Sequence, residues 1–190
     1  MRTGDLILFN GKSVVSWGIK RVLLTRFSHV GMVVELKELD LMALFESTTL
    51  SNVEDAESGE AERGVMITPL SNRIRMFKGK TYYRHLVGDL SELQIARLAE
   101  FRDMVRGRPY ERSQAELIKS RYDGPGGKNE EDLSSIFCSE LVVAAYRAMG
   151  IVEGDTPSNE FTPKNLAHKM IEKYLVPEYE LEQFRQFDYE

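Results

Sequence analysis

Phe137-Cys138-Ser139-Glu140-Leu141-Val142, continuing to Tyr146 and Met149-Gly150-Ile151, is the stretch that contains the single cysteine of this 190-residue chain. Apolar residues recur here at helical spacing. Gly150 is suited to end a helix because glycine adopts left-handed backbone angles without strain. The pattern predicts a helix over residues 138–149, with Cys138 in its first turn.

A thiol in the first turn of a helix lies near the positive end of the helix dipole and near backbone N–H groups, and both favour the thiolate. The alternative is that Cys138 is a small hydrophobic side chain buried in the core. A lone cysteine cannot form an internal disulfide, which suits a reducing compartment and leaves the thiol available for chemistry. Other parts of the sequence decide between these interpretations.

Two upstream segments supply a candidate base and a candidate carboxylate. Residues 29–36 and 43–48 are rich in strand-forming residues and are separated by the charged, turn-prone residues 37–40, which predicts an antiparallel hairpin. His29 and Glu46 are 17 residues apart, and a hairpin can place both on one face. A carboxylate bonded to one imidazole nitrogen leaves the other nitrogen to take a thiol proton. Taken singly, His29 could be satisfied by a backbone carbonyl, and Glu46 could be solvated.

The segment around Cys138 resembles the nucleophile helix of NlpC-type cell-wall peptidases, in which glycine occupies the position of Glu140. The upstream motifs Ser28-His29-Val30-Gly31 and Phe45-Glu46-Ser47-Thr48 give the order His, Glu, Cys. This order is similar to that of the YiiX-like amidases, the circularly permuted branch of the superfamily, whereas ordinary papain-like enzymes have the cysteine first. The resemblance extends from Thr3-Gly4-Asp5 to Pro163.

This resemblance implies a cysteine amidase or peptidase, a hydrolase that acts through a thioester. Cys138 would be the nucleophile, His29 the base, and Glu46 the residue that orients the imidazole. The implied substrates are a small peptide, a muropeptide or an acyl conjugate, and the reaction needs neither a cofactor nor a metal. The implied fold is a circularly permuted papain-like one.

Further residues have weaker assignments. Tyr110, in Gly107-Arg108-Pro109-Tyr110, resembles a Gly-x-Pro-Tyr element of NlpC-type enzymes and could donate to the oxyanion beside the Cys138 N–H, or could only pack. Arg84 is by default a charge at a sheet edge, with substrate-carboxylate binding as the alternative. We expect Asp5 to anchor the first turn. His85 and His168 lack metal-ligand spacing and are expected to be surface or packing residues.

The remaining pattern predicts one α+β domain over residues 1–190, with an antiparallel sheet packed against helices. Strands are expected at 4–9, 65–70 and 81–86, and a helix is expected after residue 14. A capping box at Ser91 and Gln94 begins a helix that ends near Gly107, and Thr162-Pro163 begins a helix that runs to about Glu172. Residues 51–63 are expected to form a loop, and residues 123–133 a Gly-rich connection.

Composition excludes several classes of function. The net charge is −5, so the chain lacks the general attraction to phosphate backbones that clustered Lys and Arg provide, and nucleic acid is not an expected partner. The first ten residues contain no secretory hydrophobic region, and no stretch approaches the roughly 20 apolar residues of a membrane span. We therefore expect a cytoplasmic protein without integral membrane association; no motif sets its oligomeric state.

Two alternatives to the amidase interpretation remain open. Lipid acyltransferases and phospholipases related to lecithin:retinol acyltransferase share the order His before Cys, but those enzymes usually need membrane contact. The C-terminal residues 179–190 are acidic and aromatic and contain no spanning helix, which disfavours this alternative without removing interfacial binding. A non-catalytic binding module on the same fold is the other alternative, although a binding groove does not require a nucleophile.

Overall fold

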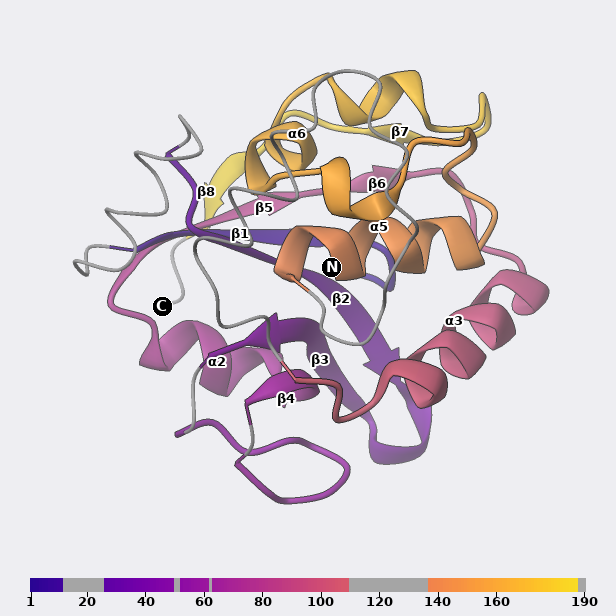
Figure 1. Cartoon of the computed structure of the whole chain (residues 1–190). Coiled ribbons are helices and arrows are strands. Elements are labelled where there is room, and N and C mark those ends of the chain that lie inside the picture. Colours follow the sequence, from indigo (N-terminus) through magenta and orange to yellow (C-terminus); the bar gives the residue numbers. More distant parts are fainter. Residues whose placement is uncertain (12–25, 50–51, 62, 110–136, 188–190) are drawn as a thin grey trace.

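A six-stranded antiparallel sheet forms the centre of the molecule (Figure 1). The computed structural model describes residues 1–11, 26–49, 52–61, 63–109 and 137–187. The strand order is β4-β3-β2-β1-β5-β8. These strands are β1 (Leu6–Gly11), β2 (His29–Leu36), β3 (Leu41–Thr48), β4 (Gly64–Pro69), β5 (Gly79–Arg84) and β8 (Arg185–Phe187). A small second sheet pairs β6 (Leu86–Val87) with β7 (Glu180–Leu181).

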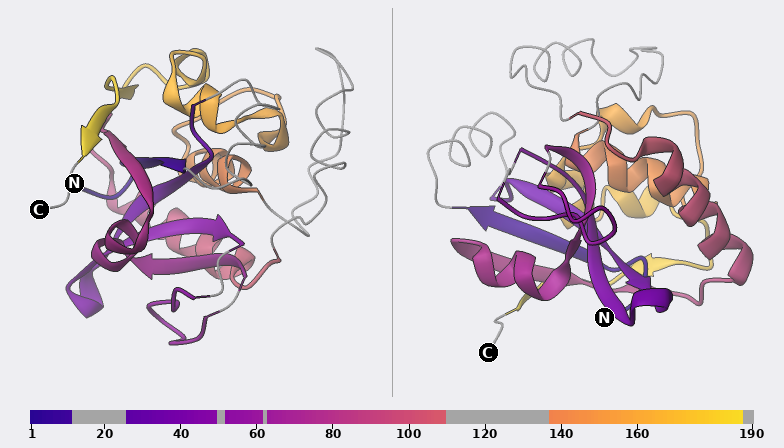
Figure 2. Two further views of the ribbon diagram at one scale, coloured as in Figure 1. Left: turned by 90° about the vertical axis from the view of Figure 1, so that its left-hand side faces the viewer. Right: turned by 90° about the horizontal axis from the view of Figure 1, so that it is seen from below.

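Helices cover both faces of this sheet (Figures 1 and 2). One face carries α3 (Glu92–Val105), α5 (Cys138–Ala148) and α6 (Pro163–Ala167), whose apolar residues join the larger core. The other face carries α2 (Leu70–Met76), which contributes to the smaller core. Three short 3-10 helices complete the described elements: η1 (Lys37–Leu39), η2 (Ser158–Glu160) and η3 (Ile171–Lys173).

The two cores divide the strand residues by their alternation. Leu6, Leu8, Val30 and Met32 face the larger core, whereas their neighbours in sequence face the smaller one, because successive side chains of a strand point to opposite faces. The central strands are therefore buried on both sides. Side chains placed at their ends lie in a low-dielectric environment.

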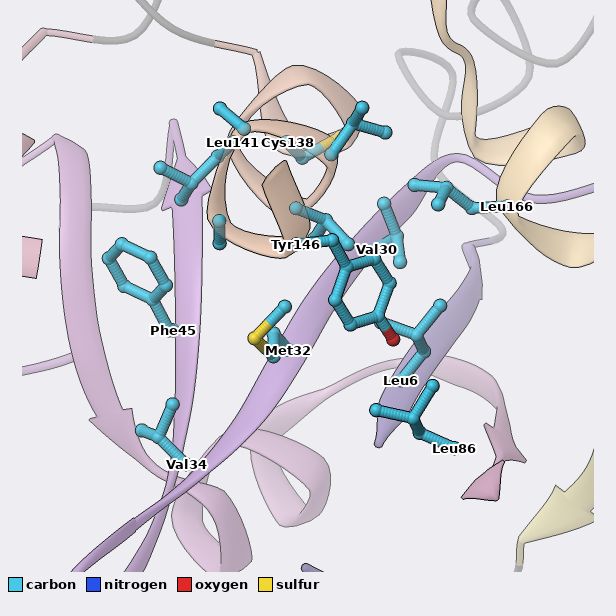
Figure 3. Close-up of a cluster of buried hydrophobic side chains, with 14 of the residues drawn as sticks. Leu6, Val30, Met32, Val34, Phe45, Leu86, Cys138, Leu141, Tyr146 and Leu166 are labelled. Atoms are coloured by element: carbon cyan, nitrogen blue, oxygen red, sulfur yellow. The ribbon is translucent and has the colours of Figure 1, made fainter. Parts of the chain in front are cut away.

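Helix α5 is more deeply buried than its one-sided apolar pattern predicts. All nine residues from Cys138 to Tyr146 are buried, because the helix packs on β2 and β3 and is also contacted by α3, η2 and α6. Figure 3 shows Cys138, Leu141 and Tyr146 on this helix beside Val30 and Met32 of β2. A thiol at the start of such a helix is fixed in the interior.

Several local predictions are confirmed. Residues 29–36 and 41–48 form the expected hairpin, and Asp40 ends its turn with φ 47° and ψ 45°. Ser91 accepts from the Gln94 N–H, and the Gln94 side chain accepts from the Ser91 N–H, which is the predicted capping box. The helix that starts at Cys138 ends before Gly150, whose φ is 70°. The α+β class with an antiparallel sheet is confirmed.

Other boundaries differ from the predictions. The helix that begins after Thr162 ends at Ala167, not near Glu172, because His168 has an extended backbone. In the acidic loop, Asp55 is buried and its carboxylate accepts the N–H groups of Glu57, Ser58 and Ile67, so this loop has a defined turn. The helix expected after residue 14 and the Gly-rich connection at 123–133 lie outside the described residues.

Candidate active site

The sheet opens between β2 and β3 at the end where the candidate residues lie. Pairing of β2 with β3 ends at Met32 opposite Phe45. Beyond that pair, β2 continues along β1 as far as His29, and β3 continues along β4 as far as Thr48. The three residues before Met32 and the three after Phe45 therefore lie outside the β2–β3 register, which leaves room for a third element between the two strands.

The N-terminus of α5 occupies this opening. Val33 donates its N–H to Asp5 on the β1 side. Because N–H groups alternate sides along a strand, Val30 directs its own N–H toward the opening. There it donates to the Cys138 sulfur, which also accepts from the Ser139 N–H. The nucleophile candidate is thus held by backbone donors from two elements.

His29 and Glu46 meet on the opposite face of the sheet. Strand alternation places His29 on the same face as Val33, and Glu46 on the same face as Leu44; both of these apolar residues belong to the smaller core. His29 Nε2 lies 2.5 Å from Glu46 Oε2. The imidazole side chain is 14% exposed and the carboxylate 0%. The ring is therefore accessible to solvent at one side and fixed by Glu46 at the other.

His29 also contacts Cys138 through a side-chain hydrogen bond. Since Nε2 is used by Glu46, the other ring nitrogen, Nδ1, is left for the thiol. The opening in the sheet is what allows a residue of α5 to reach a ring on the far face. Cys138, His29 and Glu46 form a continuous chain of contacts, although Glu46 and Cys138 are 92 residues apart in sequence.

The charged forms of Cys138, His29 and Glu46 stabilise one another electrostatically. Burial by itself opposes the imidazolium, but the Cys138 thiolate and then the Glu46 carboxylate outweigh it and raise the pKa of His29 to about 9. Burial also opposes a thiolate at Cys138. The charge and hydrogen bond of His29, together with the two backbone donors, nevertheless hold the pKa of Cys138 below that of an ordinary thiol. Each charge of the pair therefore favours the other: the thiolate raises the pKa of His29, and the imidazolium lowers the pKa of Cys138.

Glu46 has two further partners that the sequence did not reveal. Arg73 of α2 donates from Nε to Glu46 Oε1 at 2.7 Å, and Thr68 of β4 donates its hydroxyl to the same oxygen at 2.9 Å. Burial opposes the carboxylate, but Arg73 and His29 hold the pKa of Glu46 at about 2. Thr68 alternates in β4 with buried residues, and Arg73 lies in a seven-residue helix; neither pattern carries a local signal of function.

Two side chains fix the first turn of α5. The Glu140 carboxylate turns back and accepts the Phe137 N–H at 3.2 Å, and Ser139 donates its hydroxyl to the Phe161 carbonyl at 2.7 Å. Glu140, which stands where the resembling peptidases have glycine, thus closes the helix N-terminus. These bonds hold the turn that carries the thiol.

Arg84 does not lie at an exposed sheet edge. The side chain is 2% exposed, and its guanidinium donates to the carbonyls of Leu166, His168, Leu181 and Glu182 and to the Glu172 carboxylate. These acceptors belong to α6 and to the segment that follows it. The structure therefore gives Arg84 a structural role, and the default interpretation of this residue as a charge at a sheet edge was wrong. Binding of a substrate carboxylate by Arg84 stays a prediction.

Asp5 anchors the first turn of the chain, and His168 lies on the surface. Asp5 is buried and accepts from the Arg2 N–H, the Tyr83 hydroxyl, His85 Nδ1 and the Leu86 N–H, which confirms its role as an anchor of the first turn. His168 is exposed and packs its ring on Phe184. Tyr110 lies outside the described residues.

Within the described part of the chain, no group of three or more His, Cys, Asp or Glu side chains is arranged to hold a metal ion. In the same residues, no helix combines the length and apolar character required to cross a bilayer.

Comparisons with known proteins give the fold. No protein-family model matches the chain, and no curated protein matches it in sequence. Among solved structures it is similar to the crystal structure of the metalloprotein YiiX from Escherichia coli O157:H7, a DUF1105 protein, with 22% identity over 95% of each chain and a TM-score of 0.56. At this level of identity the likeness concerns the fold, and the chain has a YiiX-like α+β fold.

Proposed function

We propose that this protein is a cysteine amidase or peptidase with a circularly permuted papain-like arrangement, in which the strand carrying the histidine precedes the helix carrying the cysteine. The observation that carries the proposal is the unbroken contact from Cys138 through His29 to Glu46. A cysteine with only a packing role needs neither a buried imidazole at its sulfur nor a carboxylate behind that imidazole.

The reaction follows from the charges of the pair. The Cys138 thiolate attacks the carbonyl carbon of an amide and forms a carbon–sulfur bond. As the carbon–nitrogen bond breaks, the His29 imidazolium gives its proton to the departing amine. The neutral imidazole then takes a proton from water, the resulting hydroxide attacks the thioester, and the thiolate leaves. Glu46 keeps the ring orientation and tautomer constant throughout.

The pKa shifts of the pair support this sequence of steps. The lowered pKa of Cys138 favours the ionised nucleophile, and the pKa of His29, raised to about 9, favours the protonated acid. The proposed substrates are small peptides, muropeptides or acyl conjugates, all of which present an amide carbonyl bonded to a protonatable nitrogen.

The test is to trap the acyl-enzyme. The protein is incubated with a panel of peptide amides, muropeptides and phospholipids, and its intact mass is measured over time. We expect an acyl adduct from an amide substrate, and no adduct with Cys138→Ala. His29→Ala should slow acylation by a factor on the order of 10²–10⁴, the usual contribution of a positioned acid or base, and Glu46→Ala should slow it less.

His168→Ala is the matched control, since this histidine is exposed and packs only its ring on Phe184; its acylation rate should equal that of the unmodified protein. Adducts from phospholipid alone would identify a lipid acyltransferase or phospholipase. A tight ligand that gives neither adduct nor product would identify a binding module. An adduct that persists in Cys138→Ala would remove the nucleophile assignment.

A further inference from the structure

Arg73 forms a buried ion pair directly behind the proposed catalytic residues. Its side chain is 4% exposed, and its Nε lies 2.7 Å from Glu46 Oε1. The other carboxylate oxygen, Oε2, contacts His29. The imidazole, the carboxylate and the guanidinium therefore form a row that spans β2, β3 and α2.

Aromatic rings hold the guanidinium in place. Its central carbon lies 4.5 Å from the centroid of the Phe9 ring and 5.7 Å from that of Phe77. The Phe9 ring in turn lies 5.3 Å from the His29 ring. Stacking on aromatic faces and fork-shaped hydrogen bonding are properties of arginine that lysine lacks. One aromatic side chain thus contacts both the histidine and the arginine.

A lone carboxylate at Glu46 would perform two actions on His29 that oppose each other in the proposed reaction. It would orient the ring, which helps, and it would stabilise the imidazolium, which hinders the transfer of the proton to the leaving amine. A cation on the far side of the carboxylate weakens the second action and keeps the first. The row of side chains has this arrangement.

We propose that Arg73 is a positioning residue of the site, which offsets part of the Glu46 charge so that the carboxylate orients His29 with less stabilisation of the imidazolium. This role rests on the proposed function. Among the described residues, the charged groups that act on His29 are Cys138 on α5 and Glu46 on β3, and Arg73 on α2 acts on Glu46. Glu140, on the same turn as Cys138, directs its carboxylate to the Phe137 N–H.

The experiment measures the titration of His29 by NMR, following the ring protons of the three histidines, in variants that change one charge at a time. Arg73→Gln leaves the carboxylate uncompensated, so the His29 midpoint should rise by about one pH unit. Glu46→Gln leaves the guanidinium uncompensated, so the midpoint should fall by a similar amount. Arg73→Lys should stay near the unmodified protein.

The double variant Glu46→Gln/Arg73→Met removes both charges and should return the His29 midpoint toward that of the unmodified protein. A purely structural role for Arg73 predicts loss of stability in the single variants but not shifts of opposite sign. If Arg73→Gln does not fold, the fall in Glu46→Gln and its reversal in the double variant still decide the question. Midpoints that coincide in all folded variants would overturn the inference.

Alkylation of Cys138 against pH separates this inference from the proposed function. Cys138 is the single thiol of the chain, so the rate reports on that residue alone. A midpoint at or above about 8.5 in the unmodified protein would remove the activated nucleophile. If the alkylation midpoint of Cys138 is below about 8.5 but the His29 midpoint is the same in all Arg73 variants, only the role of Arg73 is refuted.

Discussion

The charge of each residue in the candidate site depends on its neighbour more than on its exposure. Cys138 is 4% exposed, and burial alone would keep a thiol neutral. The imidazolium of His29 and the N–H groups of Val30 and Ser139 reverse that preference. The site is therefore a coupled pair whose two protons leave in steps that belong to the pair.

Removing the thiolate should change the titration of His29. The thiolate is the largest of the contributions that raise the pKa of His29 to about 9. In Cys138→Ser this charge is absent, and the opposing effect of burial remains, so the His29 midpoint should fall by at least about one pH unit. NMR titration of the histidine ring protons measures it, with the exposed His168 as internal control. An unchanged midpoint would show that thiolate and imidazolium do not interact.

The sequence identified those members of the site that carry a local signal. Cys138 begins a helix, and His29 and Glu46 lie on two strands of one hairpin, so their residue types and positions were informative. Arg73 and Thr68 reach Glu46 from elements that are adjacent only in the fold. The burial of Arg84 was not predicted for the same reason. Its acceptors lie 82 or more residues away in sequence, so the local spacing of residues gives no sign of these contacts.

At the scale of the elements, the opening between β2 and β3 is the feature that assembles the site. Gly31 lies within this opening, and a Cβ atom there would meet three side-chain atoms of Leu44 at 2.7 to 2.9 Å. Leu44 is fully buried and cannot move aside. The absence of a side chain at position 31 leaves room for the Leu44 side chain, one residue from the N–H that holds the Cys138 sulfur.

Gly31→Ala should therefore lower the free energy of unfolding by about 1–3 kcal/mol, the usual cost of overpacking. Leu44→Ala alone should cost about 2–5 kcal/mol through the cavity that it leaves. In the double variant the new methyl group occupies part of that cavity, so the combined loss should be smaller than the sum of the two. Urea denaturation of the three variants measures the coupling. Strict additivity would mean that the two side chains do not compete for space.

The elements that were predicted correctly have clear sequence signals within the element itself. The β2–β3 hairpin has a charged turn between two apolar runs, and α3 has a capping box at Ser91. Helix α2 was not predicted, because its seven residues are too few for a periodic pattern to emerge. The last helix was predicted to be too long. Its N-terminal cap at Thr162 is visible in the sequence, but the extended backbone of His168, which ends the helix, has no local sequence signal.

At the scale of the whole molecule, one side chain links several groups of the C-terminal segment to the end of β5. Arg84, at the end of β5, binds four carbonyls and one carboxylate between Leu166 and Glu182. Strand β8 pairs with β5 next to it. Arg84 thus adds side-chain contacts to the backbone bonds of this segment, which include the pairing of β7 with β6 and the bond from the Glu182 N–H to the His85 carbonyl.

Arg84→Met should lower the free energy of unfolding by about 3–5 kcal/mol, because it breaks a buried ion pair and leaves buried carbonyls without a donor. Arg185→Met is the matched control, since its pair with Glu182 is on the surface and the Arg185 side chain is 73% exposed; it should cost at most about 1 kcal/mol. Urea unfolding followed by circular dichroism compares them. Equal losses of unfolding free energy in the two variants would contradict the structural role of Arg84 and favour a role in substrate binding.

The sheet order bears on how the protein is made. Strands β1, β2, β3 and β4 are neighbours in space in the order in which the ribosome produces them, so the half of the site that contains His29 and Glu46 leaves the ribosome first. Cys138 follows His29 by 109 residues, which corresponds to roughly 5–20 s of translation. The thiol therefore meets its activating imidazole only after most of the chain has been synthesised, and the nascent polypeptide carries no primed nucleophile while it is still unfolded.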